Sequence, residues 1–362
     1  MKKNMLLKLV ILTFLVYGCQ RADDRIAIGV VLPLTGEISS FGNLMKKNIL
    51  MAYSEKDTTK YKLLFVDSKS ESKTAINGLQ KLISTDNVKY VIGDVGSSVT
   101  LSLISFVEKN KIFLLSPGAS SPKLNNISPY FARNFPTDME ESKAVVRFIE
   151  NKLNAKKIAI IYSNTEYGLG LYSGFMSELN DDKESIIACC ESYEPDQIDF
   201  KSILVKLKTS DPDVLYLAGE EKGMGRFMKQ YKNLNLNYQI VSNINFLQPD
   251  CFNVAGNNAD GVIVPLADYD PVNSQNEKVS RFSELFKLHN NRIPSIADAV
   301  SYDVLNIMID GIEHGTTPLE AATYIRNYKK YSCALGIIDF ENGDVCMPIT
   351  FKVIRNGEVS DF

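Results

Sequence analysis

The feature that most constrains the fold is a repeated alternation between short β-rich runs and amphipathic helical stretches. Strand-like runs cover residues 25–34, 61–67, 89–94, 112–117, 156–163, 185–190, 213–219 and 238–243. Helical patterns cover residues 42–55, 73–85, 99–109, 138–153, 168–180, 199–208 and 222–233. Such alternation is typical of parallel sheets with helices on both faces. Because it restarts after a break near Pro136, we expect two doubly wound, Rossmann-like α/β lobes rather than one long sheet.

The C-terminal part departs from this pattern. A further strand is expected over 261–266, and helices are expected over 276–289, 295–313 and 317–328. The closing stretch LGIIDFENGDVCMPITFKVI is expected to form two strands around Asn342-Gly343. Asn-Gly is the dipeptide most typical of a two-residue hairpin turn.

No low-complexity linker separates the two lobes, so we expect several short crossings that form a hinge with a cleft. The expected division is a signal peptide at 1–18, a first lobe of 19–136 plus 265–338, and a second lobe of 137–264 plus 339–362.

The N-terminus has the order of a bacterial export signal. A basic start precedes an apolar run from Leu9 to Val16 and then Gly18-Cys19. The run is too short to span a bilayer, which takes about 20 apolar residues, and it fits a signal peptide. A cysteine directly after a small residue resembles a lipobox, in which cleavage leaves Cys19 to be lipidated. An ordinary signal peptide with cleavage nearby is the alternative. We expect a protein anchored outside the cytoplasm, in the periplasm or on the cell surface.

If Cys19 is lipidated, five cysteines remain, and this odd number leaves at least one thiol free or bridged to another molecule. Cys333 and Cys346 flank the expected hairpin and could pair, while buried free thiols are the alternative. No CxxC motif supports a zinc or redox site, and no metal or cofactor is expected.

Composition and motifs point away from catalysis and from nucleic acid. The formal net charge of −3 offers no attraction to nucleic acid or to an anionic membrane surface. The chain has two histidines, His289 and His314, and neither a GxSxG elbow, a P-loop, a GxGxxG loop after a strand nor HExxH. No nucleophile–base arrangement can be argued, so we expect no enzyme.

Two neighbouring strands end in loops of small, hydroxyl-bearing residues. YVIGDVGSSVT places Gly93, Gly96 and Ser97 after one strand, and FLLSPGASSP places residues 116–121 after the next. Ligands of open α/β sheets lie outside the carboxyl ends of the strands, where N–H groups and the helix dipole favour an anion such as a carboxylate. Plain turns and N-caps are the alternative for each loop alone.

These two loops, in this order, resemble the type I periplasmic binding proteins of the branched-chain amino acid family. The segments VVLPLTGEISSFG, IAIIYSNTEYGLGL, DVLYLAG, AVSYDVL and FENGD add to the resemblance, which runs from about Arg25 to the end. It implies two lobes joined by three crossings and a cleft that binds an amino acid or related small molecule. It also implies delivery of that ligand to an ABC permease.

The resemblance implies roles for particular residues. The carboxylate of the ligand would be held by Ser97 and by the triplet Gly118, Ala119 and Ser120. Phe41 would shelter the ligand from the first strand–helix loop, and Tyr167 would close over it from the second lobe.

Two positions depart from the family pattern. The family's cleft tyrosine after DVLYLAG falls on Glu220, and its ammonium-binding acid aligns near Ile244. Glu220 is therefore expected either to hold the ligand's ammonium at close range or to be a solvated loop residue.

The leading hypothesis is a lipid-anchored solute-binding protein of an ABC importer that closes on its ligand by a hinge motion. The alternative is a ligand-independent lipoprotein of the same fold, a protein-interaction module such as an activator of cell-wall synthesis. A repressor of this fold would need a helix-turn-helix motif where this chain carries an export signal.

Overall fold

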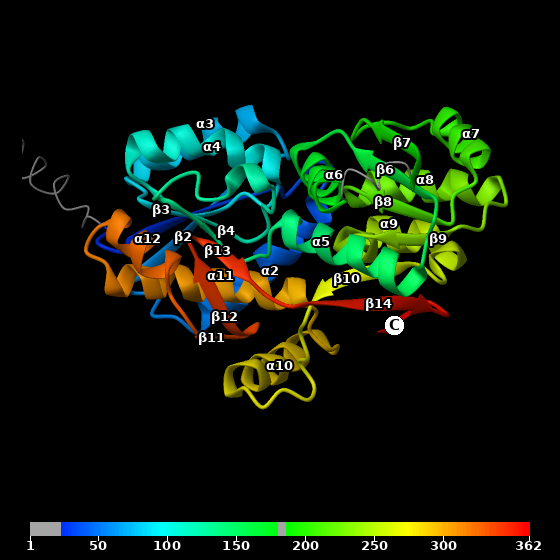
Figure 1. The fold of residues 1–362 in the computed structure, drawn as a ribbon. Helices are drawn as coiled ribbons and strands as arrows, with labels where there is room; N and C mark the ends of the chain where they lie inside the picture. Colours follow the sequence, from blue (N-terminus) through cyan, green and yellow to red (C-terminus); the bar gives the residue numbers. More distant parts are fainter. Residues whose placement is uncertain (1–22, 180–185) are drawn as a thin grey trace, which may run out of the picture.

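The computed structural model describes residues 23–179 and 186–362, which form two α/β lobes side by side (Figure 1). Lobe 1 is built on a parallel sheet of order β2-β1-β3-β4-β5. Its strands are β1 (Ile26–Leu32), β2 (Tyr61–Asp67), β3 (Tyr90–Gly93), β4 (Phe113–Ser116) and β5 (Phe131–Arg133). The expected doubly wound fold is confirmed.

Lobe 2 is built on a sheet of order β15-β14-β10-β9-β8-β6-β7. Its strands are β6 (Ile158–Ser163), β7 (Ile187–Tyr193), β8 (Val214–Ala218), β9 (Gln239–Ser242), β10 (Ile263–Ala267), β14 (Ile349–Arg355) and β15 (Glu358–Asp361). The first five pair in parallel, while β14 and β15 add an antiparallel edge. A small antiparallel sheet is formed by β11 (Tyr331–Cys333), β12 (Gly336–Glu341) and β13 (Asp344–Cys346).

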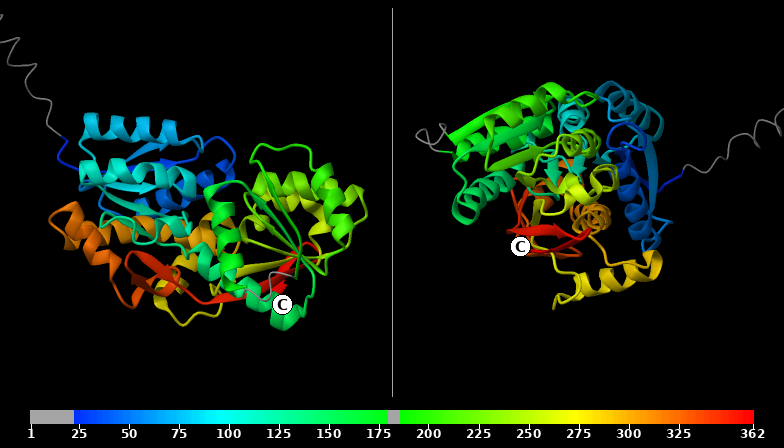
Figure 2. Two further views of the ribbon diagram at one scale, coloured as in Figure 1. Left: turned by 45° about the horizontal axis from the view of Figure 1, so that its top comes forward. Right: turned by 90° about the vertical axis from the view of Figure 1, so that its right-hand side faces the viewer.

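Helices cover both faces of each sheet (Figure 2). Those of lobe 1 are α2 (Ser39–Ser54), α3 (Ser72–Asp86), α4 (Ser97–Asn110), α10 (Glu277–Asn290), α11 (Ile296–His314) and α12 (Pro318–Arg326). Those of lobe 2 are α5 (Asp138–Phe148), α6 (Glu166–Glu178), α7 (Lys201–Ser210), α8 (Glu221–Asn233) and α9 (Pro249–Ala255).

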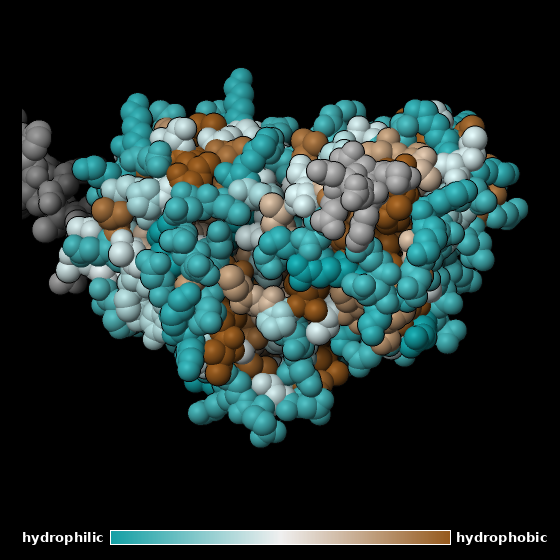
Figure 3. Space-filling view, in the orientation of Figure 1, coloured by the Kyte–Doolittle hydropathy of each residue, from teal (hydrophilic) through white to brown (hydrophobic). Residues whose placement is uncertain are grey.

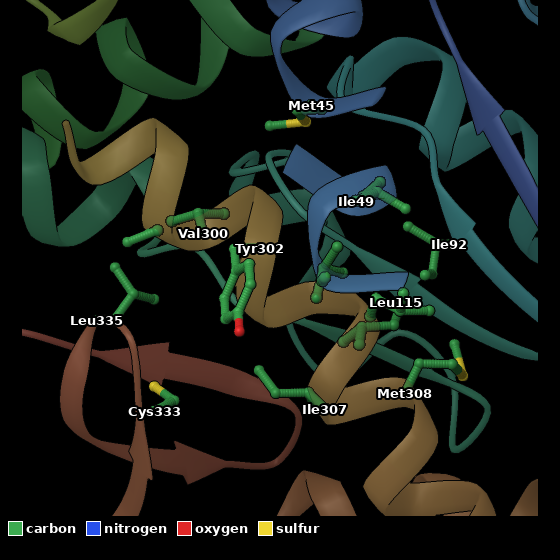
Figure 4. Packing of buried hydrophobic residues seen from close by; sticks show 14 of the residues in the cluster. Met45, Ile49, Ile92, Leu115, Val300, Tyr302, Ile307, Met308, Cys333 and Leu335 are labelled. Carbon is green, nitrogen blue, oxygen red and sulfur yellow. The ribbon is translucent and has the colours of Figure 1, made fainter. Parts of the chain in front are cut away.

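Alternate residues of β1 supply the two cores of lobe 1, as the period of a strand requires. Ile28 and Val30 pack toward α2 and α11, whereas Ala27 and Val31 pack toward α3 and α4. Figure 4 shows the first of these cores, in which side chains of α2 and α11 meet those of the central strands. Apolar side chains are thus buried on both faces of the sheet, and each Å² of apolar surface removed from water contributes about 25 cal/mol to the stability of the fold.

Three segments connect the lobes, at 134–137, 268–276 and 347–348. Two expected boundaries are wrong because they fall inside strands. Residues 265–267 belong to β10, which pairs with β14 in lobe 2. Residues 339–346 belong to the β12–β13 hairpin, whose Phe340 is buried in the core of lobe 1.

The hairpin around Asn342-Gly343 is confirmed, but the expected second strand divides at Met347-Pro348. Its first part, β13, stays in lobe 1, and its second part, β14, enters the sheet of lobe 2. Asn342 and Gly343 both have positive φ, 53° and 94°, which the tight turn requires.

The five described cysteines are all free, so Cys333 and Cys346 do not pair. Cys19 lies outside the described residues. Polar residues cover most of the face seen in Figure 3, with apolar residues in scattered small areas. Among the described helices, none combines the length and the apolar character that crossing a membrane requires.

Candidate functional site

A cavity of about 250 Å³ lies between the lobes. Residues that follow β1 to β5 form its lobe 1 side, and residues that follow β6 to β9 form its lobe 2 side. Its lining includes Glu37, Ile38, Phe41, Val95, Gly96, Ser97, Gly118, Ser120, Phe135, Thr165, Tyr167, Tyr193, Glu220, Glu221, Ile244 and Asn245. The carboxyl ends of both parallel sheets therefore face one space, as expected for a ligand site in this kind of fold.

The two small-residue loops of lobe 1 are joined through Ser97. Its hydroxyl oxygen accepts the backbone N–H groups of Ser120 and Ser121, both at 3.2 Å. Gly118 packs so closely on Val95 that a Cβ at this position would come within 2.8 Å of the Val95 Cγ1. Small residues are therefore needed here for the loops to approach one another.

Ser116 and Asp94 complete the link between the loops. The Ser116 hydroxyl donates to the backbone oxygen of Asp94 at 2.7 Å and accepts the N–H of Ala119 at 2.9 Å. One Asp94 carboxylate oxygen accepts the N–H of Gly96 at 2.7 Å, and burial raises the pKa of this carboxyl to about 6. These contacts hold the loop backbone ready for a ligand.

The detailed expectation for these loops needs a correction. The N–H groups of Gly118, Ala119 and Ser120 already bond to the hydroxyls of Ser116 and Ser97. Ala119 is buried and does not line the cavity. The donor-bearing residues that line this side of the cavity are instead Ser97 and Ser120, together with the N-terminus of α4, whose first N–H groups have no partner within the helix.

Ser120 differs from Ser97 in the hydrogen bonding of its hydroxyl. It is buried, and its oxygen makes no hydrogen bond of normal geometry with the described residues. It lies near enough to the Asp138 carboxyl to lower that group's pKa, although burial raises the same pKa to about 7. A buried hydroxyl without a firm partner is suited to a ligand acceptor.

Aromatic side chains form much of the remaining wall. Phe41 and Phe135 line it from lobe 1, and Tyr167 and Tyr193 line it from lobe 2. Tyr167 stands in the first turn of α6, which Thr165 caps by accepting the N–H of Gly168 at 3.1 Å. Phe41 and Tyr167 thus face the same cavity from opposite lobes.

The lobe 2 side of the cavity is acidic. Glu220 precedes α8, and one of its oxygens accepts the Thr165 hydroxyl at 2.7 Å while the other is buried without a partner of normal geometry. The sequence did not single out Glu221, which lines the cavity beside it and is only 1% exposed. Burial raises the pKa of both carboxyls, that of Glu221 to about 8.

No lysine, arginine or histidine lines this cavity in the described part of the chain. Residues 23–179 and 186–362 also hold no group of three or more His, Cys, Asp or Glu side chains placed to bind a metal ion. Ile244 stands where the resemblance expected an acid and contributes an apolar surface. Hydroxyl groups line the cavity from both lobes, and so do carboxylates, with Glu37 on lobe 1 and Glu220 and Glu221 on lobe 2.

Contacts between the lobes surround the cavity. The Ser40 hydroxyl donates to Asp250 at 2.8 Å, and the Lys222 ammonium donates to the Gly36 carbonyl oxygen at 2.6 Å. Arg226 of α8 pairs with Glu37 at 3.5 Å. On another side, the Lys123 ammonium lies 2.9 Å from a carboxylate oxygen of Glu166.

Arg133 is a supporting residue that sequence reasoning missed. It is 0% exposed, and its guanidinium donates to the carbonyl oxygens of Ala119 and Ser121 at 3.1 and 3.0 Å. It also donates to Asp344 at 2.7 Å, so it joins the Ser120 loop to the hairpin β12–β13. An arginine in a loop-like segment carries no sequence signal for this role.

Comparison with known proteins agrees with this geometry. Residues 25–347 match the family model described as periplasmic binding protein. The Leu/Ile/Val-binding protein homolog 3 of Brucella melitensis is 24% identical over 344 residues, which cover 91% of each chain.

Two solved structures share the fold. The leucine binding protein LivK of Thermotoga maritima superposes with a TM-score of 0.85 at 24% identity, covering 92% of this chain and 97% of that one. The substrate binding protein LivJ of Streptococcus pneumoniae, solved with isoleucine, gives a TM-score of 0.83 at 20% identity, with coverage of 92% and 97%.

Two lobes of this topology, with a cavity between the carboxyl ends of their sheets, define the type I periplasmic binding protein fold. The chain belongs to the periplasmic binding protein family. This family is extracytoplasmic, and the relatives named above are binding proteins.

Proposed function

We propose that this protein binds an amino acid or a similar small carboxylate between its lobes and presents it to an ABC permease. The observation that carries the proposal is that the Ser97 and Ser120 hydroxyls of lobe 1 and the Glu220 carboxylate of lobe 2 line one cavity. The names of its relatives, which include a Leu/Ile/Val-binding protein homolog and an isoleucine complex, support this ligand class.

The carboxylate of the ligand would bind at the N-terminus of α4. The Ser97 and Ser120 hydroxyls donate to it, and the helix dipole of α4 favours its charge. Phe41 and Tyr167 enclose the ligand's body from opposite lobes, while Gly118 leaves space for the carboxylate.

The ammonium of the ligand would bind Glu220. Since the carboxylate binds lobe 1 and the ammonium binds lobe 2, the second contact forms fully only when the lobes are close. Such differential affinity is what favours a closed state, with the three connecting segments as the hinge.

Calorimetry with a panel of amino acids and their deaminated analogues tests this function. Glu220→Gln should weaken binding of an amino acid by about 10- to 100-fold, the range for a charge-assisted hydrogen bond, and should leave the amine-free analogue nearly unchanged. Glu191→Gln removes a carboxylate of lobe 2 that pairs with Lys206 away from the cavity and serves as the matched control. Equal losses for both ligands would place Glu220 outside the ligand contact.

The proposal would be contradicted if none of the amino acids and small carboxylates bound the folded protein. That result would favour the alternative, a ligand-independent interaction module of the same fold. The folded state in that experiment is verified by a cooperative thermal unfolding transition.

We further propose that Cys19 carries the lipid anchor, on the strength of the basic, apolar, Gly18-Cys19 order. Several acyl chains on one cysteine hold a protein firmly at a membrane. Cys19→Ser should be released in soluble form or remain unprocessed, as fractionation and mass spectrometry of the N-terminus would reveal. A variant that fractionates and migrates like the parent would contradict the anchor.

A further inference from the structure

We propose that Glu221 is a second cation site in the cavity, and that the ligand is a diamino carboxylate rather than an amino acid with an apolar side chain. This inference rests on the proposed function, because it takes the carboxylate and first ammonium to bind as described above. It adds a contact for the far end of the ligand's side chain.

The first support is the state of the Glu221 carboxylate. The side chain is 1% exposed, lines the cavity, and neither of its oxygens makes a hydrogen bond of normal geometry with the described residues, although its own backbone N–H lies near enough to lower its pKa. Burying a carboxylate without a partner is costly, and native proteins seldom retain such a group without a use for it. A ligand cation supplies the missing partner.

The second support is the set of acidic groups around Glu221. Glu220 bonds to Thr165, which follows β6. Glu221 interacts through charge with Glu220 and, less strongly, with Asp250 of α9, which follows β9 on the other side of β8. Three neighbouring carboxyl groups make this part of lobe 2 favourable for a cationic group in addition to the first ammonium.

The third support is that the cationic side chains nearest in the sequence bond to groups other than Glu221. Lys222 donates to the Gly36 carbonyl, and Arg226 donates to the Pro195 carbonyl and pairs with Glu37. Neither lines the cavity. Lys222 acts on Glu221 through its charge alone, and no cationic side chain of the described residues lines the cavity or bonds to the Glu221 carboxylate.

The walls between the two ends suit an aliphatic chain. Phe41, Phe135 and Ile244 line the cavity, and a methylene stem can pack on such surfaces while its charged end reaches a polar partner. A volume of about 250 Å³ is compatible with a ligand of amino-acid size. An apolar side chain would fill the same space but leave Glu221 buried and unpaired.

Three related compounds distinguish the role of Glu221 from that of Glu220. L-Lysine has both amines, L-norleucine lacks the side-chain amine, and 6-aminohexanoate lacks the α-amine. Calorimetry on the wild-type protein should give the tightest binding for lysine. Glu221→Gln should weaken lysine and 6-aminohexanoate by about 10- to 100-fold and spare norleucine. Glu220→Gln should weaken lysine and norleucine and spare 6-aminohexanoate.

Proton release gives an independent readout. A cation beside Glu221 favours its charged form, so lysine binding at neutral pH should release protons, and norleucine binding should release fewer. Calorimetry in buffers of different ionisation enthalpy measures this difference. Glu221→Gln should abolish it, and a persisting difference would contradict the assignment.

The outcomes distinguish the two proposals. Wild-type protein that binds norleucine as tightly as lysine, or more tightly, overturns the diamino ligand but retains the amino acid site. Protein that binds none of the three compounds, nor any other small carboxylate, overturns the proposed function itself. The comparison of ligands on wild-type protein needs no variant, so it stands even where Glu221→Gln fails to fold.

Discussion

The hydroxyl oxygen of Ser97 accepts the backbone N–H of Ser120 at 3.2 Å, and so joins the loop after β3 to the loop after β4. Ser97 therefore holds the second loop in place and also lines the cavity. Ser120 lines the cavity too, but its hydroxyl makes no hydrogen bond of normal geometry with the described residues and lies near the Asp138 carboxyl.

We predict different effects for alanine at these two serines. Ser120→Ala should weaken ligand binding by about 10-fold or more and leave the free energy of unfolding within about 0.5 kcal/mol of the parent. Ser97→Ala should weaken binding as well and also lower the free energy of unfolding by about 1–3 kcal/mol, because two buried N–H groups lose their acceptor. Calorimetry and urea unfolding of both variants measure these values.

Ser102→Ala is the control for this pair, since Ser102 also lies in α4 but bonds only to its own helix, at Val99. Its ligand affinity and its free energy of unfolding should both be close to those of the parent. Equal stability of the Ser97 and Ser120 variants would contradict the structural role of Ser97.

A second prediction concerns Arg133 and Asp344. Arg133 is fully buried and Asp344 is partly exposed, so removing the arginine leaves a partly buried charge uncompensated, at a cost that reaches about 3–5 kcal/mol for a fully buried pair. Arg133→Met should therefore lower the free energy of unfolding by up to that amount and also weaken ligand binding, because the Ser120 loop loses its support. Urea unfolding and calorimetry on the folded fraction check both effects.

Arg147→Met is the matched control, since Arg147 is exposed and pairs with Glu178 within lobe 2. Exposed pairs contribute about 0–1 kcal/mol, so this variant should unfold almost like the parent. An Arg133 variant with the same small loss would show that the loop is held by other contacts.

The sequence predicted most of the fold because its elements have strong periodicity. The strand at 61–67 was expected with the bounds that β2 has, and the helix expected at 295–313 corresponds to α11. The short strand β5 was missed, since three residues in YFARNFPTD carry no period. The division between β13 and β14 was missed because a continuous strand-like run hides which sheet each half joins.

The candidate site was predictable only in part. Small-residue loops at strand ends directed attention to Ser97 and Ser120, which line the cavity together with Phe41, Gly118, Tyr167 and Glu220. Glu221 was not singled out, because burial and the lack of a partner are properties of the folded chain. The N–H groups of the second loop were expected to face a ligand, but in the folded chain serine hydroxyls already accept hydrogen bonds from them, and the sequence carries no signal of this.

A third prediction concerns the contacts between the lobes. Arg226 and Glu37 are partly exposed, and an ion pair near the surface contributes about 0.2–1 kcal/mol, so Arg226→Gln should shift the closing equilibrium by about 1.5- to 5-fold toward the open state. Ligand affinity should fall by a similar factor. Small-angle scattering of the ligand-free protein should give a larger radius of gyration.

Arg281→Gln is the control for closure, because Arg281 pairs with Glu55 inside lobe 1. It should change neither the affinity nor the radius. An Arg226 variant that behaves like this control would show that the pair does not contribute to closure.

The last prediction is that the ligand-free protein loses stability as the pH rises. Burial raises the pKa of Asp94 to about 6, of Asp138 to about 7 and of Glu221 to about 8, each above its ordinary value near 4. The native state therefore binds more protons than the unfolded state between about pH 4 and 8. Stability falls with pH wherever the native state binds more protons, with a limiting slope of about 1.4 kcal/mol per pH unit for each group.

The melting temperature of the ligand-free protein should accordingly be higher near pH 5 than near pH 8. Glu221→Gln removes the group with the highest of these three pKa values, so its melting temperature should fall less between pH 7 and 8 than that of the parent. Glu191→Gln removes a partly exposed carboxylate that pairs with Lys206, and this variant should keep the parent's slope. A parent protein whose melting temperature rises between pH 5 and 8 would contradict the prediction, because the unfolded state would then bind the extra protons.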